Sequence, residues 1–265
     1  MKYLNHRSLA VAARFAVPLR SDFRDLPAFQ RIYHFHVAHL PSTGTFAPAS
    51  SYASVNTLYP PAAGPIWPTT TLLPNGRILI VGNNPAELYD PAADSFSLTG
   101  ALTAPAYKYG AYWHTATLLP NGKVLIAGGT DELSKFENAE LYDPVTGTFT
   151  ATGIMTARRA LHTAVLLPDG TVLITGGETW LVEGRSGRFG GSLASTERYD
   201  LSTGTFSGAG SMAVGRAGHT ATVLRNGNVL ITGGVDFAPY PPGRPHRVPA
   251  SAELYVPAMP TPPDQ

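Results

Sequence analysis

The side chains best suited to hold a ligand are arginines and aromatic residues in the second half of the chain. An arginine guanidinium is a planar fork that pairs with carboxylates and other oxyanions, and aromatic rings stack on sugars and other flat ligands. The candidate residues for binding a ligand or partner are Arg158, Arg159, Trp180, Arg185, Arg188, Arg216, Asp236, Tyr240, Arg244 and Arg247. Their seven arginines stand against three acids, Glu178, Glu183 and Asp236, whereas the net charge of the whole chain is +1. This chemistry predicts recognition of an anionic protein or a glycan, unless the aromatic residues only anchor long loops and the arginines are only solvated.

Three histidines, His114, His162 and His219, are of a type that can do acid–base or metal chemistry. They occupy the same position in successive copies of a repeated motif, and a residue that recurs in this way is best explained by the packing of each copy. We therefore interpret them as structural hydrogen-bonding residues at strand starts. The same interpretation applies to the tyrosines and to the recurring glutamates Glu87, Glu140, Glu197 and Glu253.

The run from His34 to His39 holds three more histidines. On a strand, His34 and His36 face the same side about 7 Å apart and could share a metal, but His39 faces the other side. No acidic or cysteine partner lies nearby in the sequence. Ordinary strand histidines are the favoured interpretation, so the sequence predicts no metal ligand, no cofactor and no catalytic residue.

The positions of all these residues follow from a motif that recurs along the chain. The segment WHTATLLPNGKVLIAGG (113–129) returns as LHTAVLLPDGTVLITGG (161–177) and GHTATVLRNGNVLITGG (218–234), after a looser copy, WPTTTLLPNGRILIVGN (67–83). Each copy precedes a second landmark: AELYDPAADSF, AELYDPVTGTF, TERYDLSTGTF or the shortened AELYVP. The turn glycines Gly76, Gly122, Gly170 and Gly227 lie 46, 48 and 57 residues apart. A unit of this length predicts a blade or solenoid architecture.

Each unit also predicts four short antiparallel strands. Asn-Gly or Asp-Gly between β-rich runs predicts a hairpin with a type I′ turn. The second strand is a continuous apolar run, typical of a strand covered on both faces. The tyrosine landmark gives a third strand, and Thr-Gly-Thr-Phe gives a turn and a fourth strand. Four such strands make a propeller blade.

The diglycine after the second strand, the tyrosine of the third and the aromatic residue of the fourth resemble kelch repeats of the bacterial type, over residues 67–257. The chain departs from that pattern at Phe96, Phe149 and Phe206, where many kelch repeats carry tryptophan, and at Gly82-Asn83 in place of the diglycine. The resemblance implies a β-propeller. Copper-radical oxidases of the kelch family need a Cys–Tyr cross-link, and this chain has no cysteine, so that activity is rejected.

We expect an all-β kelch propeller of four full four-stranded blades plus an N-terminal strand pair, with a five-bladed body or part of a larger propeller as alternatives. Its predicted domains are a leader or divergent segment (1–31), the propeller (32–257) and a C-terminal tail (258–265). HVAHLPSTGTF (36–46) resembles half a unit and the last unit lacks its fourth strand. We therefore expect Ser42–Ala47 to pair beside Ala252–Val256 and close the ring.

Topology predicts two unlike rims. The Pro-Asn-Gly-type turns lie on one rim, and the long segments 130–138, 178–195 and 235–251 lie on the other. Variable loops on a rigid scaffold are the usual place for binding sites. We therefore predict a non-catalytic kelch interaction protein that binds a protein partner or a glycan through its long-loop rim. The alternative is a carbohydrate-active kelch enzyme, such as a sialic-acid mutarotase-like isomerase, with Glu178, Asp236 and His246 as acid–base residues.

The composition of the chain reduces the classes of partner to be considered. Charged residues make up 14% of the chain and its net charge is +1, which argues against a nucleic-acid binder. No apolar run approaches the length of a membrane span. Six Lys and Arg residues lie in segment 1–31, where SLAVAARFAVPL is a weak signal-peptide core interrupted by Arg14. Secretion or a periplasmic location is left open, and a monomer is expected.

Overall fold

The computed structural model describes residues 38–40, 45–47, 68–82, 84–104, 112–130, 136–182, 188–237 and 248–257. All of them belong to one compact unit, Phe35–Gln265. The predicted leader and C-terminal tail lie outside the described residues, as do His34 and His36. Within the described ranges every regular element is a β-strand, and no helix long and apolar enough to cross a membrane is found there.

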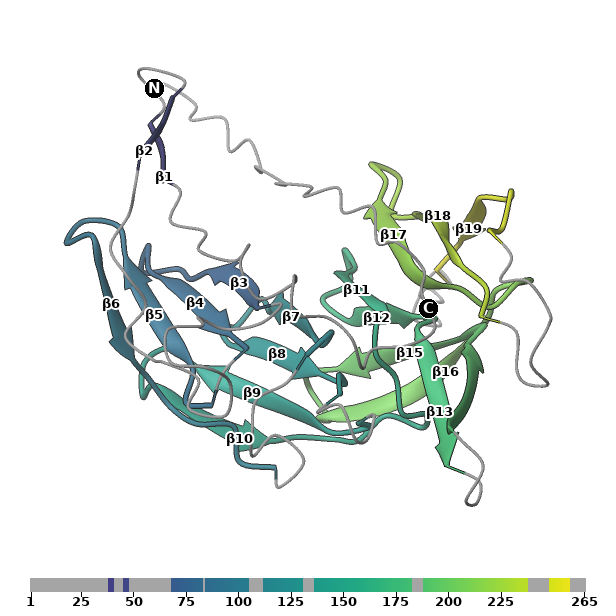
Figure 1. Ribbon diagram of the computed structural model, residues 1–265, viewed down its shortest axis with the longest axis horizontal. Helices are drawn as coiled ribbons and strands as arrows, with labels where there is room; N and C mark the ends of the chain where they lie inside the picture. The colour runs from purple at the N-terminus through teal and green to yellow at the C-terminus, as the bar shows by residue number, and fades with distance from the viewer. Residues whose placement is uncertain are drawn as a thin grey trace, which may run out of the picture. The chain divides into compact units, whose positions relative to one another are not determined.

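Four small antiparallel sheets form a four-bladed β-propeller, which confirms the predicted fold class (Figure 1). Blade 1 contains β3 (Thr69–Leu72), β4 (Ile78–Val81), β5 (Glu87–Asp90) and β6 (Ser95–Leu98), and blade 2 contains β7 (Thr115–Leu118), β8 (Val124–Ala127), β9 (Ala139–Asp143) and β10 (Thr148–Ala151). Blade 3 contains β11 (Thr163–Leu166), β12 (Val172–Thr175), β15 (Ser195–Asp200) and β16 (Thr205–Ser211), and blade 4 contains β17 (Ala217–Val223), β18 (Val229–Val235) and β19 (Glu253–Tyr255). The first strand of each blade is its inner strand, and successive inner strands β3, β7, β11 and β17 are neighbours.

Two short strand pairs accompany the blades. The predicted N-terminal pair is present as β1 (Ala38–Leu40) and β2 (Thr45–Ala47). A hairpin of β13 (Glu178–Val182) and β14 (Arg188–Ser192) is inserted between β12 and β15 of blade 3. The sequence predicted a long loop there, so the two strands of this hairpin were not predicted.

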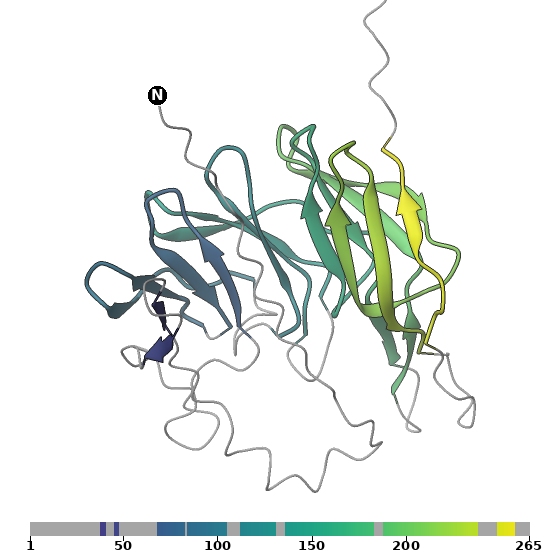
Figure 2. The same ribbon diagram turned by 90° about the horizontal axis from the view of Figure 1, so that it is seen from above.

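The predicted closure by the N-terminal segment is wrong. Strand β2 pairs with β1, and within the described residues β19 pairs with β18 alone. Blade 4 therefore has three strands, and its yellow edge strand β19 is seen in Figure 2. The two short strands of segment 38–47 satisfy one another's backbone groups in a local hairpin, which needs no long loop closure.

The Pro-Asn-Gly turns lie on one rim, as predicted, but their predicted type I′ geometry is wrong. Only the glycine has a positive φ, +82° at Gly122, and proline in the first loop position fixes a negative φ. The backbone N–H of Gly122 donates to Leu119 and that of Leu119 donates to Lys123, which encloses a three-residue loop ending in a left-handed glycine. The ring of Pro74 lies 3.6 Å from the position of a Cβ at Gly122, so neighbouring turns touch along this rim.

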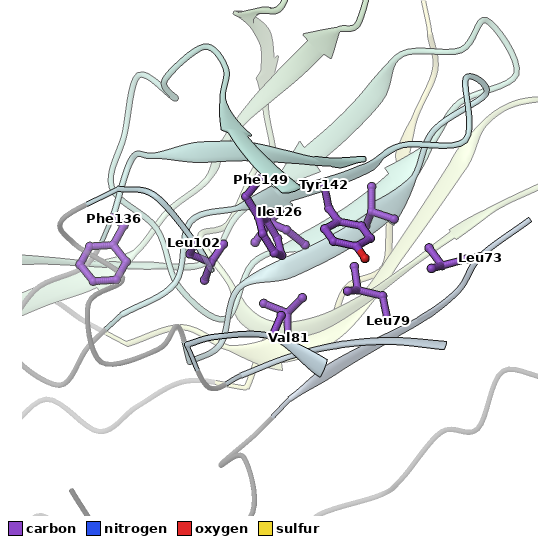
Figure 3. Close-up of a cluster of buried hydrophobic side chains, with 10 residues drawn as sticks. Leu73, Leu79, Val81, Leu102, Ile126, Phe136, Tyr142 and Phe149 are labelled. Carbon is purple, nitrogen blue, oxygen red and sulfur yellow. The ribbon is translucent and has the colours of Figure 1, made fainter. Parts of the chain in front are cut away.

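The hydrophobic core lies between the blades. Leu79 and Val81 of β4 pack against Val124 and Ile126 of β8, together with Tyr142 of β9 (Figure 3). Equivalent clusters join blade 2 to blade 3 and blade 3 to blade 4. Strands β8 and β12 are buried along their whole length, because a blade covers each of their faces. The rear faces of blades 1, 2 and 3 thus each pack against the front face of the following blade.

Hydrogen bonds outside the core repeat with the same spacing. The hydroxyl of Tyr142 lies 2.8 Å from Thr99 of the connection leaving blade 1, and that of Tyr199 lies 2.8 Å from Thr152 of the connection leaving blade 2. Nearer the axis, the N–H of Leu161 donates to Trp113 and the N–H of Gly218 donates to Leu161. Blades 1 and 2 are therefore joined at their outer edge, blades 3 and 4 at their inner edge, and blades 2 and 3 at both.

Candidate functional site

The long-loop rim is built on the diglycines that end the second strands. The N–H of Phe136 donates to Gly129 at 2.9 Å, and the N–H of Leu193 donates to Gly177 at 2.7 Å. These equivalent bonds close the bases of segment 130–135 in blade 2 and of the β13–β14 hairpin in blade 3. The loops that differ most between blades thus begin from the same backbone frame.

The β13–β14 hairpin is tied to the loop that follows β18. The N–H of Ser192 donates to the carbonyl of Phe237 at 3.1 Å, and the N–H of Phe237 donates to Ser192 Oγ at 2.9 Å. Ser192 Oγ also donates to the carbonyl of Val235 at 2.9 Å. These contacts confirm that the segments beginning at 178 and 235 lie together on the rim opposite the Pro-Asn-Gly turns. They also place the partly buried Asp236 beside the base of the hairpin.

Arg159 and Arg216 are scaffold residues rather than rim residues, since neither has exposed surface. Arg159 Nη2 donates to Glu197 at 2.5 Å and its Nη1 donates to the carbonyl of Gly176 at 2.8 Å. Arg216 makes the equivalent bond to Glu253 at 2.8 Å. Burial lowers the pKa of Arg159 from its ordinary value, and the adjacent Glu197 carboxylate partly offsets this effect. Neither side chain can contact a ligand here, which corrects their assignment to the binding surface.

The other candidate residues fall into two groups. Arg158 is exposed and its Nε lies 2.5 Å from Glu137, an exposed ion pair on the same rim. Trp180 and Arg188 lie on β13 and β14, and the backbone of Trp180 pairs with Gly190. The remaining four candidates lie outside the described residues: Arg185, Tyr240, Arg244 and Arg247.

A hollow of about 370 Å³ opens between the inner strands and is lined by their threonine, alanine and histidine residues. The histidines in its wall connect the blades. Nε2 of His114 lies 2.7 Å from the Thr69 hydroxyl, and Nε2 of His162 lies 3.0 Å from that of Thr115. Nε2 of His219 lies 3.0 Å from the Thr163 hydroxyl and 2.8 Å from that of Thr175. Each histidine thus bonds a threonine of the preceding blade, which confirms its interpretation as structural.

His162 and His219 are held in their neutral form. Burial lowers the pKa of His162 well below its ordinary range, and the nearby Arg159 lowers it further. Burial, followed by the charge of Arg216, lowers the pKa of His219 to about 4. A neutral imidazole has one N–H and one acceptor nitrogen, which suits a bond to a threonine hydroxyl. The arrangement supports packing of the blades at neutral pH rather than proton transfer.

The recurring glutamates are also structural, as predicted. Glu140 accepts from the backbone N–H of Thr103 and of Ala104, the latter at 2.7 Å. Glu197 and Glu253 accept in the same way from Thr156 and Ala213. Each carboxylate fixes the connection by which the chain enters its blade.

The sequence could have revealed the inserted hairpin, but not the role of Ser192. The apolar runs around Trp180 and Phe189 flank Glu-Gly-Arg-Ser-Gly, and turn residues between two such runs are a hairpin signal. No signal marked Ser192, because its three bonds depend on where blade 4 lies. Across the described ranges, no three His, Cys, Asp or Glu side chains converge in a possible metal site.

Neither a protein-family model nor a curated protein matches this chain.

Proposed function

We propose that the protein is a kelch-type interaction propeller that binds an anionic protein or a glycan through its long-loop rim. The observation that supports this proposal is the difference between the two rims. One rim consists of short turns, in which the proline of one turn contacts the glycine of the next. The other rim carries the β13–β14 hairpin, which is hydrogen-bonded through Ser192 to the loop after β18. Rigid scaffolds with elaborated loops at one end are typical binding proteins.

The chemistry of the proposed surface comes from Arg158, Arg185, Arg188, Arg244 and Arg247, with Trp180 and Tyr240 as stacking residues. Without the two buried arginines, five cations stand against Glu178, Glu183 and Asp236. The surface is therefore less positive than the sequence indicated. Moderate positive charge with aromatic residues favours carboxylate-bearing glycans or acidic peptide segments over polyanions.

The hydrogen bonds that the described titratable residues make within the scaffold favour binding over catalysis. Glu197 is bonded to Arg159 and Thr156, and His162 and His219 are bonded to threonines of the preceding blade. These groups stabilise the scaffold at every repeat, so their use in acid–base chemistry would compete with folding. Arg158 of the rim, in contrast, makes an exposed ion pair with Glu137, and such a pair contributes little to folding.

The test is a binding measurement on a glycan array and by pull-down with the full chain. A variant with Arg185, Arg188, Arg244 and Arg247 replaced by alanine should lose binding and keep its stability, because exposed charges contribute little to folding. The matched control removes four cations from the opposite side: Arg77, Lys123, Arg198 and Arg225. Retention of every ligand by the first variant, or equal losses in both, would refute the proposed surface.

The aromatic residues distinguish ligand contact from loop anchoring. Replacing Trp180 and Tyr240 by alanine should weaken binding of a glycan through lost stacking and leave the loops resistant to protease. Rapid cleavage within 178–195 or 235–251 in these variants would instead show that the rings only anchor the loops.

One observation favours a second candidate, the carbohydrate-active enzyme. Glu178 pairs with Ser192 across the hairpin, and Ser192 bonds both residues that flank Asp236. The backbones of Glu178 and Asp236 therefore both lie next to Ser192 on the long-loop rim. Turnover of a free sugar by the wild type, lost on replacing Glu178 by glutamine, would establish this function in place of simple binding.

A further inference from the structure

The rear face of blade 4 carries the surface that every other blade buries against its successor. Leu79, Leu125 and Leu173 occupy one position of the second strand and are 0%, 1% and 0% exposed, whereas Leu230 at that position is 36% exposed. Leu254 on the neighbouring strand β19 is 51% exposed. The equivalent Leu88 and Leu141 pack into the clusters between blades. Blade 4 therefore presents an apolar face of the kind that a following blade covers.

The diglycine of blade 4 has open space where the other diglycines contact a following blade. A Cβ at Gly176 would lie 2.5 Å from the carbonyl oxygen of Arg216 and 2.8 Å from the His219 ring of the next blade. The equivalent Gly128 has the same close neighbours, Arg159 and His162. At Gly233 nothing lies within 4 Å. Among the described residues, none occupies the space that receives an arginine carbonyl and a histidine ring in the other blades.

Two hydroxyls on the same face match the histidine partner of blade 3. In blade 3, Thr163 and Thr175 lie 2.7 Å apart and both reach His219 Nε2. In blade 4, the equivalent Thr220 and Thr232 lie 3.0 Å apart. Thr175 is completely buried beneath the following blade, whereas its equivalent Thr232 is half-buried, and Thr163 is half-buried, whereas its equivalent Thr220 is exposed. The hydroxyl pair that binds an incoming imidazole is thus already assembled.

We infer that the rear face of blade 4 docks a further blade of the same repeat, whose lead into its inner strand carries Met-x-x-x-Arg-x-x-His. This motif is the one that fills the equivalent sites: Met155, Arg159 and His162 behind blade 2, and Met212, Arg216 and His219 behind blade 3. The imidazole would bond Thr220 and Thr232, the arginine carbonyl would lie against Gly233, and the new front face would cover Leu230. This surface is separate from the long-loop rim and does not depend on the function proposed for it.

The front face of blade 1, whether of the same chain or of a second copy, fits the rear face of blade 4 less well than a histidine-bearing blade does. Pro68 stands where the other blades have histidine, so that face has no imidazole for the threonine pair. Its own apolar residues Leu72 and Leu98 are 63% and 54% exposed, which shows that it is not covered by blade 4. A histidine-bearing blade satisfies the hydroxyls as well as the apolar surface.

The test adds the inferred blade to the full chain by repeating residues 201–257 directly after Val256, the position equivalent to Asp200. The repeat supplies an outer strand for blade 4 and a second copy of the lead that ends in His219. We expect the amide exchange of Leu230 and Thr232 to slow by about tenfold or more. The added histidine should titrate by NMR near the low pKa of about 4 that burial gives His219.

The matched control is the same extended chain with Thr220→Val and Thr232→Val, which keeps the apolar face and removes the hydroxyls. It should lose most of the added protection. Unchanged exchange at Leu230 together with an added histidine that titrates near 6.5 would overturn the inference. Equal protection with and without the hydroxyls would overturn the histidine as the recognised group. A dimer of the unextended chain that Leu230→Lys dissociates would also overturn the inference, because it would assign the face to a second copy.

Discussion

Lowering the pH from 7 to 5 should destabilise the propeller through its inter-blade histidines, and His219 gives the clearest case. Its pKa is about 4 in the folded protein, below the ordinary value of 6.5 that it regains on unfolding. Between these values the unfolded chain binds a proton that the folded chain does not, so stability rises with pH in this window. The contribution is complete above pH 6.5 and is lost as the pH falls toward 4.

The magnitude follows from the size of the shift. A difference of about 2.5 pKa units corresponds to about 3 kcal/mol of unfolding free energy in full, of which about 2 kcal/mol is lost between pH 7 and pH 5. His162, whose pKa is lowered further by burial and by Arg159, adds to the wild-type loss in the same direction.

The assay is urea unfolding of the full chain at both pH values, for the wild type and for His219→Gln. Glutamine does not titrate, so the variant should lose about 2 kcal/mol less stability on acidification than the wild type. Because the comparison is between pH values within each protein, the cost of the substitution itself cancels. Equal pH dependence in the two proteins would refute the reasoning, as would a wild type that becomes more stable at pH 5.

Two further predictions concern the contacts between and within blades. Gly176→Ala should lower the free energy of unfolding by about 3 kcal/mol or more, because Gly176 has a φ of +59° and a Cβ there would lie 2.5 Å from the carbonyl oxygen of Arg216. Gly233→Ala should lower it by only about 1 kcal/mol, because Gly233 has a φ of +73° but open space around it. Equal losses of stability in thermal or urea unfolding would contradict this prediction. Glu197→Gln should cost about 3 kcal/mol, since it leaves the Arg159 guanidinium buried without its counter-ion, while Arg158→Ala on the surface should change stability by less than about 1 kcal/mol in the same measurement.

Repetition made the scaffold predictable from the sequence. The shared His, Glu, Tyr and diglycine positions face the same packing problem in successive blades, and many of them have equivalent partners, as the histidines bonded to a threonine of the preceding blade show. Blade-specific features were harder to predict. The lead residue Arg159 was grouped with Arg158 because adjacent arginines look alike in sequence, yet one is buried against Glu197 and the other is exposed beside Glu137. Only the three-dimensional path of the segment that enters β11 determines which of the two arginines is buried.

The N-terminal segment shows a second limit. HVAHLPSTGTF resembles the end of a unit, and similarity alone suggested that Ser42–Ala47 completes blade 4. Its preceding strand lies closer along the chain and competes for the same backbone groups, so the local pair β1–β2 forms instead. Resemblance identifies what a strand can pair with, while chain distance decides between partners that are equally suitable.

The hydrogen bond that closes each loop base has a consequence for how this protein can change. Gly129 and Phe136 enclose six residues, and Gly177 and Leu193 enclose fifteen, yet both pairs keep the same bond. Closing the longer loop costs only about 1 kcal/mol more chain entropy than closing the shorter one. Insertions at these two positions are therefore nearly independent of the blades beneath them, so either loop can be lengthened or exchanged by itself. The loops of this rim can in this respect diverge in sequence and length while the framework of blades stays constant.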